Sequence, residues 1–321
     1  QVQLLAVLSE YPKESVLPAI LMAAKSSSKD VHIAALKALE KTGDASVVQY
    51  LAETAARSPK AEQAIARASL WGLKGEDVDE AILSLLLDRS DEDVQAELVQ
   101  SIGERRIFAG KSLVAKFADA PSAKVRGQAY RALRAIGTPS DIPGLLEILL
   151  KTENEVETLE IESAITGLAQ KISNPNGRAA AVRAKLDVEK DDQKRGLLLR
   201  VLGKIGDESS LSRLRKALKD PNAGVVDAAL RSLENWPTPA ARDDVREIAR
   251  SSKNEVHRVL ALQAFVRMIG QEKYRSPKAA ASDLKKALKL ASRPEEKKLI
   301  LGVLPVFASP EALKLAATLL G

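Results

Sequence analysis

The chain has 321 residues, of which 45% are hydrophobic but only 3% aromatic, and it contains no cysteine. A core of Ala, Leu, Val and Ile suits close packing of helices better than a sheet, and the lack of cysteine excludes disulfides, thiolate metal sites and cysteine nucleophiles. The net charge of +6 is uneven, because residues 1–160 carry 19 Lys and Arg against 24 Asp and Glu, whereas residues 161–321 carry 30 against 19.

We expect neither a membrane span nor a signal peptide in this sequence. No apolar run approaches the roughly 18 to 20 residues that a spanning helix needs, and the start at Gln1 lacks the basic and then apolar pattern of a signal peptide. We therefore expect a soluble segment cut from a longer chain, and the sequence leaves its compartment open.

Strings with the same helical pattern recur along the chain. In chain order they read DVHIAALKALEKTG at 30–43, DVQAELVQSIGERR at 93–106, KVRGQAYRALRAIG at 124–137, KRGLLLRVLGKIG at 194–206 and GVVDAALRSLENWP at 224–237. In the 124–137 string, Val125, Ala129, Leu133 and Ile136 share one helix face, and Gly137 closes the helix. Each string predicts a helix with one buried face.

The position that closes each of these helices recurs every 31 to 38 residues. It is occupied in turn by Gly43, Gly75, Arg106, Gly137, Ile172, Gly206, Pro237, Gly270 and Ala308. The residues seven and four positions before these marks are apolar in every unit except at Gln263, so we predict that they are buried. In the second unit they are Ala68 and Trp71.

A shorter first helix is predicted before each of these second helices, as at 47–56, 142–150, 211–218 and 245–249. The units are joined by the tetrapeptides at 43–46, 137–140 and 206–209, which read GDAS, GTPS and GDES. There Gly is expected to take the left-handed conformation that ends a helix, and an Asp, Thr or Ser oxygen is expected to cap the amides of the next one. The result is two helices about every 33 residues.

The turn into Val-Arg, followed by A-L-x-x-L-x-x-I-G and then D-x-S or T-P-S, resembles the HEAT repeats of bacterial proteins, particularly the short type also found in phycobilin lyases. The resemblance covers residues 14–320, although only Val125-Arg126 keeps the Val-Arg pair and Val31-His32, Val94-Gln95 and Val225-Val226 do not. It implies an all-α, right-handed α-solenoid of about nine HEAT-like helix pairs, whose second helices line the concave side. We expect a single solenoid domain over residues 1–321, a module of a larger bacterial protein that is exported, periplasmic or cytoplasmic. A tetratricopeptide array, the rival architecture, lacks its Trp, Leu-Gly, Tyr and Pro signature here.

The sequence offers no assembled catalytic, cofactor or metal site. His32 and His257 stand more than two hundred positions apart in a fold whose units touch only their neighbours, and each is predicted at an exposed position near the start of a second helix. The string AGKS at 109–112 lacks the preceding Gly of a phosphate-binding loop. The acidic run at 88–93 is expected to cap a helix rather than to bind a metal, and Trp71 and Trp236 are expected in the core.

Long cations do recur at equivalent places on the second helices. Lys37, Arg131, Arg200 and Arg231 stand six positions before their marks, and Arg134 and Arg267 stand three positions before theirs, with Thr166 interrupting the series. If these side chains face the groove, they form a discontinuous positive track for carboxylates or phosphates. The alternative is that their long stems cover the edges of the core.

The leading functional hypothesis is a non-catalytic scaffold, monomeric and without a cofactor, that binds a protein or peptide on the concave surface. The alternative is binding of nucleic acid or another polyanion through the basic C-terminal half. A chromophore-handling protein like the lyases that share the repeat is a third possibility, which rests on the resemblance alone.

Overall fold

The computed structural model describes residues 1–11, 13–271, 276–307 and 309–320, and these residues form α-helices and short 3-10 turns, with no strand among them. The prediction of an all-α fold is confirmed. Contacts within the chain divide it into two compact units, unit 1 at Gln1–Leu168 and unit 2 at Ala169–Gly321. The single domain expected over residues 1–321 stays a prediction.

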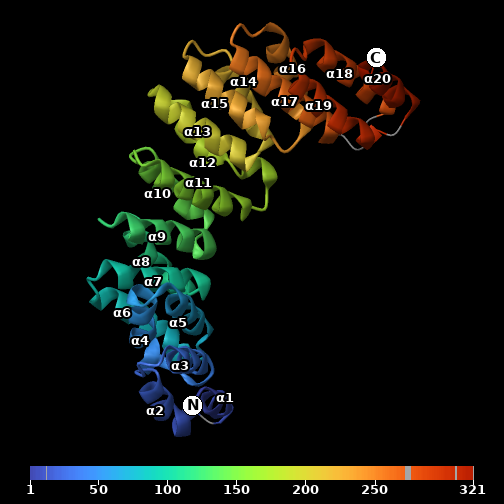
Figure 1. The fold of residues 1–321 in the computed structure, drawn as a ribbon. Helices are drawn as coiled ribbons and strands as arrows, with labels where there is room; N and C mark the ends of the chain where they lie inside the picture. The colour runs from blue at the N-terminus through green and yellow to red at the C-terminus, as the bar shows by residue number, and fades with distance from the viewer. Residues whose placement is uncertain (12, 272–275, 308, 321) are drawn as a thin grey trace. The chain divides into compact units, whose positions relative to one another are not determined.

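Unit 1 consists of a short helix, α1 (Val2–Leu8), followed by helix pairs that succeed one another in chain order (Figure 1). The second helices α3, α5, α7 and α9 pack on the first helices α2, α4, α6 and α8, and α3, α5 and α7 each contact the next second helix in that row. Helix α9 reaches α11 through side chains, from Arg131 to Glu160 and from Arg134 to Ser163. The first helices are α2 (Lys13–Ala23), α4 (Val48–Arg57), α6 (Glu76–Asp88), α8 (Lys111–Phe117) and α10 (Ile142–Leu149). The second helices are α3 (Lys29–Thr42), α5 (Lys60–Gly72), α7 (Glu92–Glu104), α9 (Ala123–Ile136) and α11 (Glu155–Gln170), whose last turn crosses the boundary between the units.

Unit 2 repeats the arrangement. Contacts run along its row of second helices, from α13 to α15, α17 and α19. The first helices are α12 (Ala180–Val188), α14 (Leu211–Ala217), α16 (Arg242–Ser251) and α18 (Pro277–Leu290). The second helices are α13 (Asp192–Ile205), α15 (Ala223–Glu234), α17 (Glu255–Gln271) and α19 (Pro294–Val303), and α20 (Pro310–Leu320) follows. The described residues therefore contain the expected nine helix pairs.

The predicted register holds in most units. Leu36 and Leu39 of α3, and Leu199 and Leu202 of α13, are at most 1% exposed, as are Val99 and Ile102 of α7. Trp236, also predicted in the core, is completely buried. The closing mark at Ala308 lies outside the described residues.

The predicted register of the second unit is wrong. Helix α5 ends at Gly72, and Gly75, with φ of 124°, precedes the next helix instead of closing this one. Ala68 is consequently exposed and Trp71 half-buried, while Ala66 and Leu70 occupy the core. In the eighth and ninth units, Gln263 and Leu301 are likewise only half-buried.

The junctions between units cap the next helix as predicted. Asp44 accepts a hydrogen bond from the Ser46 amide at 3.0 Å, and the Asp141 carboxylate accepts one from the Thr138 amide at 2.7 Å. The left-handed conformation occurs at Gly206, with φ of 68°, but Gly43 has φ of −74°. Gly43 is needed for space instead, because a Cβ there would lie 2.5 Å from the Leu39 carbonyl oxygen.

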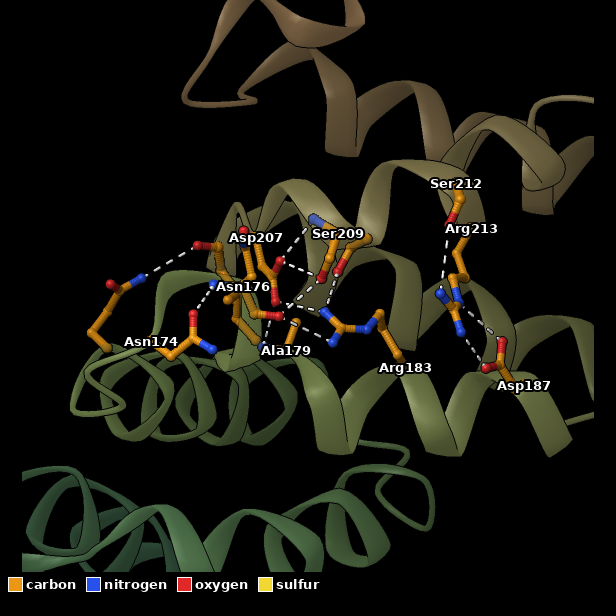
Figure 2. A network of polar contacts seen from close by, with 12 residues as sticks. Asn174, Asn176, Ala179, Arg183, Asp187, Asp207, Ser209, Ser212 and Arg213 are labelled. Atoms are coloured by element: carbon orange, nitrogen blue, oxygen red, sulfur yellow. Dashed lines mark hydrogen bonds and ion pairs between the residues drawn. The ribbon is translucent and has the colours of Figure 1, made fainter.

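Asp207 ties the junction after α13 to the preceding first helix (Figure 2). Its side chain has no exposed surface and accepts hydrogen bonds from the amides of Ser209 and Ala179, at 2.8 and 3.0 Å, and from Nη1 of Arg183 at 2.6 Å. Burial raises the pKa of Asp207, but the hydrogen bonds from Ser209, Ala179 and Arg183 outweigh it, so the net shift is downward. The carboxylate therefore holds consecutive helix pairs together in its charged form.

Candidate binding face

Five of the six predicted cations line hollows on the solvent side of the second helices, which we call the second-helix face. The hollow between α1 and α3 has a volume of 490 Å³ and includes Lys37. The hollow formed by α7, α9 and α11 has 670 Å³ and includes Arg131 and Arg134, and the hollow between α13 and α15 has 590 Å³ and includes Arg200 and Arg231.

Small residues on facing helices create these hollows. Gly103 and Ala132 face each other in the hollow of unit 1 formed by α7, α9 and α11, where a Cβ on Gly103 would lie 2.8 Å from the Ala132 Cα. In the hollow of unit 2, Gly196, Gly224 and Ala228 play the same part. Small residues at the contact between the helices fill little space above it, so the longer polar side chains around them form the walls of a hollow.

Arg131 bridges two second helices in unit 1. Its Nη2 lies 2.5 Å from Oε1 of Glu160, and the two side chains are 57% and 26% exposed. The hydrogen bond from Arg131 lowers the pKa of Glu160 below its ordinary value, and the charge of Arg134 contributes in the same direction. Lys37, by contrast, makes no ion pair with any residue that the structure describes.

Arg134 lies beside this pair without a carboxylate of its own. Its Nη1 donates a hydrogen bond to Oγ of Ser163 at 2.9 Å. The stem crosses Gly167, where a Cβ would come within 2.6 Å of the Arg134 Cγ. The guanidinium therefore stays at the hollow while the stem covers the neighbouring helix.

Arg106 also lines this hollow, although the sequence analysis did not select it. It is exposed, and its φ of 56° makes it a non-glycine residue in the left-handed region. The available signal was its position, because Arg106 occupies the closing mark where Gly43, Gly75, Gly137 and Gly206 stand in other units.

In unit 2 the hollow between α13 and α15 contains a balanced pair. Nε of Arg231 lies 2.7 Å from Oδ2 of Asp227 on the preceding turn of the same helix. Asp227 also has Nε2 of His257 3.7 Å away, and Arg200 is half-buried at the rim. Asp227 therefore restrains Arg231, which the sequence analysis considered without a partner.

Arg267 has a different role. Its Nε donates to the Glu234 carbonyl at 2.5 Å and its Nη2 to the Trp236 carbonyl at 2.7 Å, and burial lowers its pKa. The Glu234 carbonyl lies in the last turn of α15 and the Trp236 carbonyl lies just beyond it, where carbonyl groups have no N–H donor within the helix. Arg267 thus follows the alternative that the sequence analysis left open, a long side chain at the edge of the core.

In the Val-Arg pair of the repeat, the side chain at the Arg position donates hydrogen bonds to the turn between the first and second helices. In unit 1, Nη1 of Arg126 donates to the carbonyls of Ala120 and Pro121 at 2.8 and 2.7 Å. Gln95, which departs from the expected Arg, makes the same kind of bond to the Arg89 carbonyl at 2.6 Å. An amide therefore replaces the guanidinium as the donor that closes the turn.

The histidines and the apparent phosphate loop take structural positions. His32 lies between the Tyr50 hydroxyl at 3.0 Å and Glu62 at 3.3 Å, and His257 is only 8% exposed, so the prediction that both are exposed is wrong. Lys111 begins α8 and its Nζ lies 3.4 Å from Asp141. Among the described residues, no group of three His, Asp or Glu could hold a metal ion, and no helix has the length and apolar character to cross a bilayer.

Comparisons with known proteins agree with this architecture. A family model described as HEAT repeats matches residues 80–166 and 179–266. A solved structure of Kap95p with RanGDP contains a chain that aligns with 95% of this chain, with a TM-score of 0.61 and 13% identity, and the aligned part is 47% of that other chain. A solved structure of E. coli YibA aligns with 83% of this chain and 96% of its own, with a TM-score of 0.41 and 15% identity. A search of curated proteins gave no significant match.

Proposed function

The chain belongs to the family of HEAT-repeat proteins, and we propose that it is a non-catalytic scaffold that binds a protein or peptide on its second-helix face. It is an all-α HEAT-repeat solenoid, a fold that typically mediates protein interactions. The solved structure that shares the fold has Kap95p bound to RanGDP, and this chain spans about half of the chain it resembles there. We propose that the scaffold acts as a monomer and without a cofactor.

The mixed charge of the hollows is the observation that carries the proposal. Arg131 faces Glu160, and Arg231 faces Asp227. A surface with both cationic and anionic side chains suits a polypeptide, because a peptide backbone carries both hydrogen-bond donors and acceptors. A groove for a polyanion would instead present cations without carboxylates, because their charge serves to replace counterions.

Ion pairs also engage five arginines of unit 2. Arg183, Arg195 and Arg213 each pair with an Asp of the same unit, and so do Arg215 and Arg231. The surplus of 30 Lys and Arg over 19 Asp and Glu at residues 161–321 remains, but these five arginines have carboxylates beside them. The mixture of both signs at these positions favours a protein partner over nucleic acid.

Photo-crosslinking to selected peptides tests the proposal. A photoreactive amino acid is placed at Gln128 or Gln193 in the hollows, or at the exposed Lys116 on α8 as the matched control. Peptides enriched from a random displayed library should crosslink at the two hollow positions and not at Lys116. Enrichment of no peptide, or crosslinking at Lys116 alone, would contradict the proposal.

A salt titration with duplex DNA tests the alternative. We expect weak binding that shows little change between low and physiological salt, because Arg131 and Arg231 of the hollows are already paired with the carboxylates of Glu160 and Asp227. Tight binding at low salt that weakens steeply as salt rises would instead support the polyanion function.

A further inference from the structure

We propose that the hollow formed by α7, α9 and α11 binds a carboxylate-bearing peptide, with Arg106 and Arg134 as the residues that contact the carboxylate. This inference rests on the proposed function and specifies its partner chemistry. The hollow is lined by Gln100, Gly103, Glu104, Arg106, Gln128, Arg131, Ala132, Arg134, Ala135, Leu159, Glu160 and Ser163.

The first argument is the charge that is left over in this hollow. Three Arg and two Glu line it, and the pairing of Arg131 with Glu160 leaves Arg106, Arg134 and Glu104, with a net charge of +1. Arg134 makes a hydrogen bond to the neutral Ser163 but no ion pair, and Arg106 makes no ion pair, with any residue that the structure describes. A carboxylate entering this hollow would gain charge-assisted hydrogen bonds from these cations without first breaking an ion pair.

The second argument is the backbone of Arg106. The Arg106 amide donates to the Gly103 carbonyl at 3.2 Å and the Ile107 amide to the Ile102 carbonyl at 2.9 Å, which is the pair of bonds that ends a helix with a left-handed residue. Gly206 fills the corresponding place after α13 with φ of 68°. An L side chain at this conformation is unfavourable, and strain of this kind is concentrated at functional sites. Arg106 thus has a strained backbone conformation, and its cationic side chain lines the hollow.

The third argument identifies a peptide and not a bare anion. Oε1 of Gln128 is buried and has no hydrogen-bond donor among the described residues, so it offers an acceptor for a peptide N–H. Leu159 is 49% exposed at the same hollow and can pack against an apolar side chain. A volume of 670 Å³ is within the range of sites that enclose small ligands, so a few residues of a peptide fit.

Titration of the isotope-labelled full chain with defined peptides tests this inference. The probe is acetyl-Gly-Leu-Glu-Glu-Gly-amide, and the comparison peptide has Gln in place of both Glu. A third peptide keeps Gln but ends in a free carboxylate, which distinguishes a chain terminus from an acidic side chain, and inorganic phosphate is the fourth ligand. Binding is followed by the NMR shifts of the Arg Nε and Gln side-chain amide groups.

We expect the carboxylate peptides to shift the signals of Arg106, Arg134 and Gln128. The variants Arg106→Gly and Arg134→Gln should each weaken the binding by about tenfold, since each loses a charge-assisted hydrogen bond. The control Lys116→Gln removes one positive charge from the same unit, on the first helix α8, and should leave the affinity unchanged. Gly is compatible with the conformation at 106, so that variant retains the fold.

Three results would overturn the inference. Equal affinity for the Gln-amide peptide at the same signals would refute carboxylate recognition but leave peptide binding on the second-helix face intact. Preference for inorganic phosphate over the peptides would indicate a simple anion site. No shift on the second helices with these peptides, while library peptides crosslink at Gln193, would place the binding site elsewhere on that face.

Discussion

At the scale of single residues, the long cations of the second helices have separate roles that depend on what lies opposite. Arg134 extends forward across Gly167 to Ser163 because the glycine leaves space for its stem. Arg267 extends backward because α15 ends at Glu234 and leaves carbonyls exposed at its end. The same sequence position therefore yields a candidate binding residue in one unit and a helix cap in another.

Replacement of Arg106 by Gly should stabilise the protein. The left-handed conformation costs an L residue about 1–2 kcal/mol in the folded state, and Gly removes this cost. Gly also gives the unfolded chain more conformational entropy, which reduces the gain in stability by about 0.4–1 kcal/mol. The expected gain is about 1 kcal/mol or less, measured as a higher urea midpoint. Gly206→Ala is the matched control and should lower the midpoint, because its Cβ would lie 2.4 Å from Pro237 Cγ at φ of 68°. A lower midpoint for Arg106→Gly would show that the arginine is not strained.

Asp207 should make stability sensitive to acid. Its pKa in the folded state lies below the value of about 3.9 of an unfolded Asp, so its contribution is complete above about pH 4 and is lost as the pH falls through the folded pKa. Near pH 7, Asp207→Asn should destabilise by about 3 kcal/mol, since Arg183 loses its charged partner in a buried place. Urea midpoints of the unchanged protein and of Asp207→Asn, measured near pH 7 and again below about pH 4, check this. A gap between the two proteins that does not narrow in acid would contradict the assignment.

At the scale of the helices, the sequence predicts the repeated helix pairs, but it does not predict the exact ends of single helices or the partners of single side chains. The nine pairs could be predicted because apolar residues return to the same face of each second helix, as Leu36 and Leu199 do. The end of α5, and with it the buried face of that helix, was mispredicted because Gly occurs both after a helix and before the next one. Gly75 precedes α6 instead of closing α5. Of the candidate site, the cations on second helices could be predicted, but not the partners, since Glu160 and Asp227 follow no repeat position.

Close packing of α7 against α9 gives a prediction at this scale. Gly103→Ala should destabilise by about 1–3 kcal/mol, because the new Cβ would lie 2.8 Å from the Ala132 Cα and backbone atoms must move. Gly127→Ala on α9 is the control, with nothing within 4 Å of its Cβ, and should stabilise by about 0.5–1 kcal/mol. Thermal melting of both variants distinguishes them. A melting temperature for Gly103→Ala that is as high as or higher than that of the unchanged protein would mean that the helices do not meet closely at Gly103.

At the scale of the whole molecule, each of the two units buries its apolar faces by stacking helix pairs, and within each unit the row of second helices carries polar hollows. A repeat protein of this kind has contacts mainly between neighbouring pairs, so no residue distant in sequence completes a site. The binding surface that we propose is therefore made by side chains of adjacent second helices, as in the hollow of α7, α9 and α11. This is the physical basis for proposing a scaffold rather than an enzyme.

Hydrogen exchange of the full chain, with and without a peptide selected from the random library, measures most directly whether the second-helix face is the binding surface. We predict that the added protection falls on second helices, foremost α7, α9 and α11, and that α6, α8 and α10 exchange as before. Protection centred on the first helices, or none at a saturating peptide concentration, would contradict the account.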